Sequence, residues 1–114
     1  MKLPKTEQAA MRREKIVDYL LSPTHRSGRG KAEFFTLFGF SREDWETLAS
    51  ALRNHAATHE VAKIESSPFG TRYIVEGEIV SPDGRNPLVR VIWFVETGEE
   101  VPRLVTAYPL KELT

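Results

Sequence analysis

The segment between residues 22 and 31 carries the largest group of side chains that could do chemistry. It has no acidic residue and combines a histidine, three cations and two glycines, namely His25, Arg26, Arg29, Lys31, Gly28 and Gly30. Glycines expose backbone N–H groups, and a helix that starts beside cations is a natural phosphate site. A Walker A loop is excluded, because position 25 is His instead of Gly and position 32 is Ala instead of Ser or Thr. The segment indicates an anion-binding loop with a titratable histidine, or a solvated loop that joins two helices.

The second candidate is an arginine within an apolar stretch. Arg90 interrupts a run from Leu88 to Val95 in which both alternating faces are largely apolar. An arginine in such a place needs a partner or a function. One interpretation is an ion pair with Glu76 or Glu78 across a strand ladder, and the other is phosphate binding.

A third candidate is a pair of histidines one helical turn apart, His55 and His59. This spacing can hold zinc, but the sequence offers no third ligand and no glutamate between the two. We therefore favour an interaction of both rings with the dipole at a helix C-terminus. We expect no metal site and no cofactor, and the absence of cysteine excludes a thiolate site or a Cys nucleophile.

The spacing of apolar residues predicts the elements that would position these side chains. Helices are expected over residues 13–21, 31–38 and 42–58, the last opened by Ser41 and Asp44 as a weak capping box. Period-two patterns predict four strands, over 61–66, 71–80, 88–95 and 103–109. Short turns between them imply antiparallel neighbours. The expected fold class is therefore α+β, with N-terminal helices followed by a four-stranded antiparallel meander.

The spacing of apolar residues also predicts which side chains lie in the core and which lie on the other face of the sheet. Leu104, Thr106 and Tyr108 are expected to share one face of the last strand, opposite Arg103, Val105 and Ala107. The predicted core residues are Phe34, Phe35, Phe38, Trp45, Leu48, Leu52 and Val91.

Length and charge limit the classes of protein to which the chain can belong. The chain has 114 residues and a formal net charge of zero, which predicts one domain spanning 1–114. Its longest purely apolar run, residues 92–95, is too short to cross a bilayer, and no signal-peptide pattern is present. We expect a cytoplasmic protein that binds no membrane, and zero net charge argues against a broadly basic coat for nucleic acid.

Several motifs together resemble a family of small bacterial domains of unknown function. They are Asp18 to His25, then Gly28, Lys31-Ala32, Phe34-Phe35, Gly39-Phe40, Arg90 to Trp93 and Pro102 to Pro109. The resemblance covers nearly the whole chain. A looser likeness is to the barnase, EndoU, colicin D and RelE-type ribonucleases, in which helices precede a four-stranded antiparallel sheet. The sequence Thr106-Ala107-Tyr108-Pro109 is similar to the Thr-x-Tyr-Pro that ends many of them.

The ribonuclease likeness implies a metal-independent endoribonuclease of the toxin type. Carried over by position, it gives the catalytic residues His25, Lys31, Arg90, Thr106 and Tyr108, with Arg29, Gly30 and Arg103 as further phosphate-binding residues. His25 would be the general base or acid, while Lys31 and Arg90 would bind the scissile phosphate. Thr106 would hydrogen-bond a phosphate oxygen, and Tyr108 would stack on a base or support Arg90.

Two other functions stay open. The chain could be a non-catalytic binding module that captures an anionic group of a ligand or of a protein partner, such as an immunity protein. It could also be a structural accessory to the product of a neighbouring gene. The partners expected are thus RNA or a protein, and not DNA. Convergence of His25, Lys31, Arg90, Thr106 and Tyr108 in one cleft would favour the ribonuclease.

Overall fold

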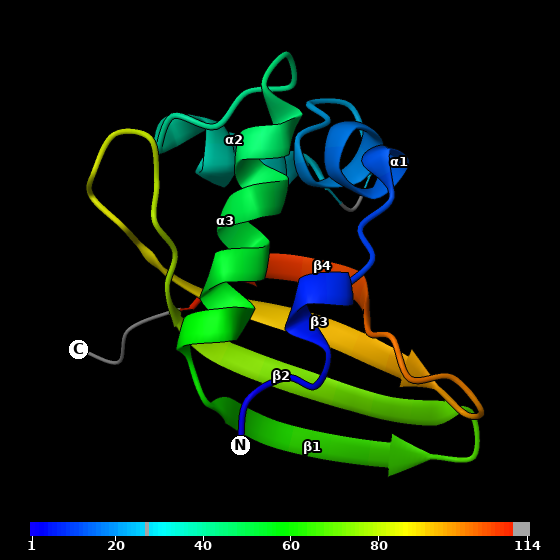
Figure 1. Cartoon of the computed structure of the whole chain (residues 1–114). Coiled ribbons are helices and arrows are strands. Elements are labelled where there is room, and N and C mark those ends of the chain that lie inside the picture. Colours follow the sequence, from blue (N-terminus) through cyan, green and yellow to red (C-terminus); the bar gives the residue numbers. More distant parts are fainter. Residues whose placement is uncertain (27, 111–114) are drawn as a thin grey trace.

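The computed structural model describes residues 1–26 and 28–110. Its helical half contains η1 (Thr6–Gln8), α1 (Arg13–Lys15), η2 (Ile16–Leu20), α2 (Arg29–Leu37) and α3 (Trp45–Thr58). The strands that follow are β1 (Val61–Ser67), β2 (Gly70–Glu78), β3 (Leu88–Glu96) and β4 (Arg103–Pro109). They form an antiparallel sheet in the order β1-β2-β3-β4 (Figure 1). The predicted α+β architecture with a meander sheet is confirmed.

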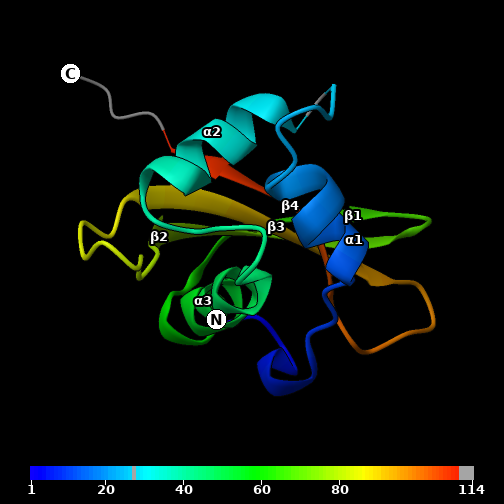
Figure 2. The same ribbon diagram turned by 90° about the horizontal axis from the view of Figure 1, so that it is seen from above.

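Helix α3 lies across one face of the sheet, while α2 lies beside the edge strand β4 (Figures 1 and 2). Leu48, Leu52 and Ala56 recur every four residues along α3, so they share one side of the helix and are fully buried. On β3, Val91 and Trp93 point to the same core and are also fully buried. Burial of this apolar surface is the main force that holds the helical half on the sheet.

The predicted core is confirmed for Phe35, Leu48, Leu52 and Val91, but Phe34, Phe38 and Trp45 are only partly buried. Phe40 is buried in their place. Gly39 ends α2 in the left-handed region, at φ 102°, and the Phe40 N–H donates to the Phe35 carbonyl at 3.1 Å. This reversal folds the Phe40 ring back onto Phe35, with 5.9 Å between ring centroids.

The helix starts differ from prediction by two or three residues. Helix α2 begins at Arg29, and α3 begins at Trp45, three residues after the predicted start. Ser41 forms a turn ahead of the helix, because its Oγ accepts the Asp44 N–H at 3.2 Å. Asp44 then occupies the N-cap position and accepts the Thr47 hydroxyl at 2.6 Å. The predicted helix over 13–21 continues from α1 into a π-helical turn, η2, closed by a bond from the Leu21 N–H to the Ile16 carbonyl at 2.8 Å.

Strand β4 contains a bulge that changes which side chains face outward. Ile92 on β3 pairs with Thr106, but the next residue, Trp93, pairs with Leu104, which leaves Val105 as the extra residue. Leu104 is buried in the core, whereas Thr106 lies on the opposite face. The predicted common face of Leu104 with Thr106 and Tyr108 is therefore wrong, because one inserted residue shifts the alternation.

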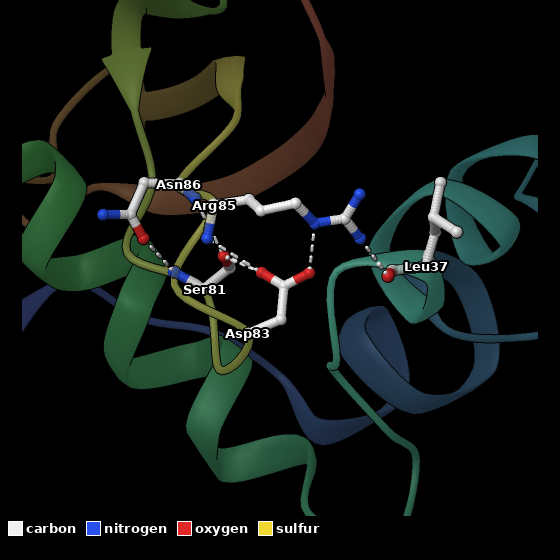
Figure 3. A network of polar contacts seen from close by, with 5 residues as sticks. All are labelled: Leu37, Ser81, Asp83, Arg85 and Asn86. Atoms are coloured by element: carbon white, nitrogen blue, oxygen red, sulfur yellow. Dashed lines mark hydrogen bonds and ion pairs between the residues drawn. The ribbon is translucent and has the colours of Figure 1, made fainter.

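The loop between β2 and β3 holds the C-terminal end of α2 (Figure 3). The Asp83 carboxylate accepts the Ser81 hydroxyl at 2.8 Å and the Arg85 Nε–H at 2.6 Å. Arg85 in turn donates to the Leu37 carbonyl at 2.8 Å, and its guanidinium lies 4.3 Å from the centroid of the Phe38 ring. A cation from the loop thus satisfies a terminal carbonyl of α2. The backbone N–H of Arg85, followed by the Ser81 and Arg85 side chains, lowers the pKa of Asp83.

His55 is a core residue of α3. Its side chain is 1% exposed, and its Nε2–H donates to the Gly77 carbonyl on β2 at 3.1 Å. The His59 ring stacks beside it, with 4.6 Å between centroids, and His59 Nδ1 donates to the His55 carbonyl at 2.9 Å. Burial, reinforced by the charge of His59, lowers the pKa of His55 to about 4. The dipole interpretation is therefore wrong for His55, which is neutral at pH 7.

We expect the stability of the fold to fall as the pH drops from about 6.5 toward 4. In this window the unfolded chain protonates His55 and the folded chain does not, so lower pH favours unfolding. A pKa lowered from 6.5 to about 4 corresponds to about 3 kcal/mol.

Chemical denaturation of wild type and of His55→Gln at a series of pH values measures this contribution. Glutamine can still donate to the Gly77 carbonyl but does not titrate, so the variant should lose less stability across the window. Equal losses of stability in wild type and in His55→Gln would contradict the assignment of this pH dependence to His55.

Candidate functional site

The phenol of Tyr19 joins three elements at the outer edge of the sheet. Lys31 Nζ on α2 donates to the Tyr19 hydroxyl at 2.7 Å, and the same hydroxyl lies 3.1 Å from Thr106 Oγ1 on β4. Tyr19 itself comes from the π turn η2, a kind of turn that is frequent at functional sites. Thr106 reaches this position because the bulge at Val105 turns it away from the core. Two of the predicted catalytic residues, Lys31 and Thr106, therefore meet on a residue that was not predicted.

His25 lies against the same phenol. Its ring is edge-on to Tyr19, with 4.9 Å between centroids and an interplanar angle of 76°. His25 Nδ1 accepts the Gly28 N–H at 3.1 Å, and its carbonyl accepts the Arg29 N–H at 2.9 Å, so this residue also starts the turn into α2. A neutral ring whose Nδ1 accepts a hydrogen bond carries its proton on Nε2. Of the two roles predicted for His25, donation from Nε2 is the one that this arrangement favours.

A cavity of about 740 Å³ opens beside this group. Its lining combines the phenol and histidine with charged side chains of both signs, namely Arg12, Glu14, Lys15, Asp18, Tyr19, His25, Val105 and Thr106. Lys15 Nζ lies 5.1 Å, and Lys31 Nζ 4.9 Å, from the centroid of the Tyr19 ring. Of the two acids in the lining, Asp18 lies 3.4 Å from the Arg42 guanidinium, which offsets its negative charge. The lining itself balances two cations, Arg12 and Lys15, against two acids, and the excess of positive charge comes from Arg42 and Lys31 beside it.

These neighbours change the acidity of the phenol. Partial burial acts to raise the pKa of Tyr19, but the hydrogen bonds with Lys31 and Thr106 and the charges of Lys31 and Lys15 together outweigh it. The pKa of Tyr19 is lowered from its ordinary value. Stabilisation of the phenolate is the physical cause, since each of these contacts is stronger with the charged oxygen.

Arg90 and Tyr108 form a second, neighbouring group. Arg90 donates to the Glu76 carboxylate across the β2–β3 ladder and lies 3.4 Å from the Tyr108 hydroxyl. The hydrogen bonds with Tyr108 and Glu76 raise the pKa of Arg90, so it stays charged. The ion pair with Glu76 is one of the two interpretations drawn from the sequence. Arg90 pairs with Tyr108 and Ile92 pairs with Thr106, so the two groups are consecutive on the same face.

The predicted phosphate-binding residues lie around this arrangement. Arg29 and Gly30 are exposed in the first turn of α2, and Arg29 borders a small cavity that also includes His25. Arg103 is exposed at the start of β4, with its guanidinium 5.4 Å from the centroid of the Phe94 ring. It lines a cavity of about 410 Å³ that shares Arg12 and Lys15 with the cavity beside Tyr19. His25, Lys31 and Thr106 thus all contact the Tyr19 side chain directly. The other predicted site residues lie next to this group.

Tyr19 was not among the residues predicted from the sequence. The predicted helix over 13–21 has Ile16, Val17, Leu20 and Leu21 as its apolar stripe. Tyr19 lies at the margin of this stripe, with Lys15 one turn before it. The sequence did offer one signal for Tyr19. It is an amphipathic side chain at the margin of a buried stripe, one helical turn from a cation. Its contact with Thr106 spans 87 positions and could not be read from local spacing.

Comparison with known proteins places the chain in a family. Residues 2–111 match the family described as a domain of unknown function (DUF6883), and the chain belongs to it. This confirms the predicted membership of a family of unknown function. No curated protein matches the chain.

The fold is shared with a solved structure, described as "Contact-dependent growth inhibition toxin - immunity protein complex from Klebsiella pneumoniae 342". A chain in that complex superposes on the present one with a TM-score of 0.71 at 16% identity. The match covers 88% of the present chain and 98% of that chain. At this identity the likeness concerns the fold alone.

Two further findings concern metal ions and membranes. Among residues 1–26 and 28–110, no three or more His, Asp or Glu side chains cluster in a way that could hold a metal ion. Over the same residues, no helix has the length and hydrophobicity that crossing a bilayer would require.

Gly28 controls the approach of the loop to Tyr19, and its replacement tests this. A Cβ at position 28 would collide with the Tyr19 carbonyl, whereas a Cβ at Gly30 would meet no atom within 4 Å. We expect Gly28→Ala to cost about 1–3 kcal/mol of folding stability, as overpacking does. Gly30→Ala should be neutral or stabilise by up to about 1 kcal/mol, because glycine within a helix is unfavourable.

Equilibrium unfolding in urea compares these two variants. Equal stability of the two alanine variants would show that the loop does not depend on the close approach at Gly28.

Proposed function

We propose that this chain is a metal-independent endoribonuclease of the toxin type, which cleaves RNA through the ribose 2′-hydroxyl. The observation that carries the proposal is the meeting of His25, Lys31 and Thr106 around the Tyr19 hydroxyl at the edge of this cavity. Such a set offers hydrogen-bond donors and a fixed positive charge where a phosphate could bind. It requires no metal, because the attacking oxygen belongs to the substrate.

The proposed roles follow from the contacts. Lys31 and the cations of the cavity hold the scissile phosphate, and Thr106 Oγ1 donates to one of its oxygens. His25 donates from Nε2 toward the charge that develops on the phosphate. Arg90 and Tyr108 lie next along the same face, where a charged guanidinium and an aromatic ring suit the neighbouring phosphate and base.

The toxin-type character is supported by the fold likeness to a chain from a toxin–immunity complex. A cytoplasmic place of action fits this proposal, because RNA is the substrate.

A second function, a non-catalytic module that binds an anionic group of a protein partner, is supported by other observations. The solved complex is described as containing an immunity protein as well as a toxin. Arg90 already has a carboxylate partner in Glu76, and His25 Nδ1 is already engaged with Gly28. With Nδ1 occupied, His25 is not arranged to accept a proton, which suits a site that binds without reacting.

We expect single-stranded RNA to be cleaved in excess chelator, with products that end in a 2′,3′-cyclic phosphate. DNA of the same sequence should stay intact, because it lacks the attacking hydroxyl. His25→Ala should lower the rate about 10²–10³-fold, the size typical of one lost donor to a developing charge. Arg90→Ala should lose a comparable factor through weaker phosphate stabilisation.

The matched controls are Lys63→Ala and Arg72→Ala, on β1 and β2, neither of which lines the cavity. Both remove exposed cations and should leave the rate unchanged. Cleavage that disappears with chelator, or a fully active His25→Ala variant, would contradict the mechanism. Absence of cleavage by folded wild type, together with partner capture, would favour the binding module.

A further inference from the structure

The cleavage proposed above needs a group that accepts the proton of the 2′-hydroxyl, and His25 is poorly arranged for it. The lone pair of His25 Nδ1 is occupied by the Gly28 N–H at 3.1 Å, which places the ring proton on Nε2. The other histidines, His55 and His59, pack against Gly77 of β2, and neither lines the Tyr19 cavity. The acceptor has to come from another side chain of the cavity.

We infer that Tyr19 is a catalytic residue of this reaction, whose phenolate oxygen takes the proton from the attacking 2′-hydroxyl. The inference rests on the proposed ribonuclease function and assigns a role to a residue to which neither the sequence nor the resemblance gave one. Lys31 acquires a second role in it, because its ammonium holds the phenol oxygen in place and favours its charged form.

The geometry around the phenol supports this assignment. The Tyr19 oxygen is held from two sides, by Lys31 Nζ at 2.7 Å and by Thr106 Oγ1 at 3.1 Å. Once ionised, it accepts the single hydroxyl proton of Thr106, so in this mechanism Thr106 positions Tyr19 and does not donate to the phosphate. Its ring is flanked by His25 on one edge and lines the open cavity. A side chain fixed by hydrogen bonds from separate elements is arranged before substrate binds, which is what proton transfer at a defined atom requires.

The charges that face the phenol favour its ionised form. The cations are Arg12 and Lys15 before it in the chain and Lys31 on α2, and the acids are Glu14 and Asp18; the His25 ring also faces it, with Nδ1 accepting the Gly28 N–H. Asp18 lies close to the Arg42 guanidinium, and the contacts with Lys31 and Thr106 bind the phenol oxygen directly. The lowered pKa of Tyr19 agrees with this balance. A phenol made more acidic has more phenolate present at any given pH, and therefore more of the form that can accept a proton.

The proposed step conserves atoms and charge. The phenolate oxygen of Tyr19 removes the proton from the 2′-hydroxyl as that oxygen forms a bond to the adjacent phosphorus. The bond from phosphorus to the 5′-oxygen breaks, and that oxygen takes a proton from water in the cavity. The products are a 2′,3′-cyclic phosphate and a free 5′-hydroxyl, and Tyr19 returns its proton to the hydroxide formed. No oxidant, reductant or metal takes part.

The kinetic test uses a single-stranded RNA of mixed sequence with wild type, Tyr19→Phe and the matched control Tyr73→Phe. Tyr73 lies on the core side of β2, so its hydroxyl is outside the site. Tyr19→Phe should lower the rate about 10²–10⁴-fold, and Tyr73→Phe should not. The wild-type rate should rise with pH until Tyr19 is ionised. Lys31→Met should move this rise to higher pH, and Lys31→Arg should restore part of the shift.

A second readout does not depend on cleavage. The ultraviolet absorbance of tyrosinate is titrated without RNA. Wild type should show one tyrosine ionisation at lowered pH that is missing in Tyr19→Phe, and Lys31→Met should move this ionisation to higher pH. Circular dichroism confirms that each variant folds.

The outcomes separate the inference from the proposed function. If wild type cleaves RNA and Tyr19→Phe cleaves equally well, the inference is overturned and the ribonuclease function stands. If wild type cleaves no RNA, both are overturned, whatever the absorbance titration shows. A wild-type pH profile that Lys31→Met leaves unchanged would also overturn the inference.

Discussion

The extra residue at Val105 in β4 is the constraint on which the candidate site depends. A regular strand would put Leu104 and Thr106 on the same face, so either a leucine would leave the core or a threonine would enter it. The bulge allows Leu104 to pair with Trp93 inside and Thr106 to pair with Ile92 outside. Thr106 then reaches the Tyr19 hydroxyl at the edge of the sheet. One inserted residue thus serves the packing of the core and the polar group together.

The position of Lys31 is fixed from both ends of α2. At the start of the helix, Gly28 passes so close to the Tyr19 carbonyl that no side chain fits, and His25 accepts its N–H. At the other end, Arg85 binds the Leu37 carbonyl while its guanidinium covers Phe38. A short helix held in this way cannot slide along the sheet edge without breaking contacts at one end. The lysine is therefore presented to the phenol by rigid surroundings, which is the usual condition for a functional side chain to act at a defined position.

The fold was predictable from sequence to a greater extent than the site. All four strands were placed within two residues of their observed bounds, because β2, β3 and β4 bury one face and their apolar spacing records this, while turn residues bound the exposed β1. The Phe40 and His55 positions were not predictable in the same way. Phe40 depends on a chain reversal at Gly39, and His55 depends on a backbone carbonyl of Gly77 that lies 22 positions away.

The site was predicted in part for the same physical reason. His25 and Lys31 stood out because local composition showed a basic loop before a helix, and Arg90 because it interrupted an apolar run. Tyr19 did not stand out, because its role comes from partners on two other elements. A bulge leaves no mark in the apolar pattern of β4, where Leu104, Val105 and Thr106 would suit either face. Local sequence reveals unusual residues, whereas the contacts between elements decide which of them act together.

The meander topology has a consequence for the order in which the molecule assembles. Each strand pairs with its neighbour in the chain, so the sheet closes through short loops that cost little entropy. The bond between Tyr19 and Thr106 instead closes a loop of 87 positions. Contacts of this length form after the hairpins, and the partly exposed groups that make them add little apolar burial. The polar contact beside the cavity can therefore open locally to admit a large substrate, while Ile16, Leu20 and Phe35, which are fully buried, keep η2 and α2 packed on the sheet and α3.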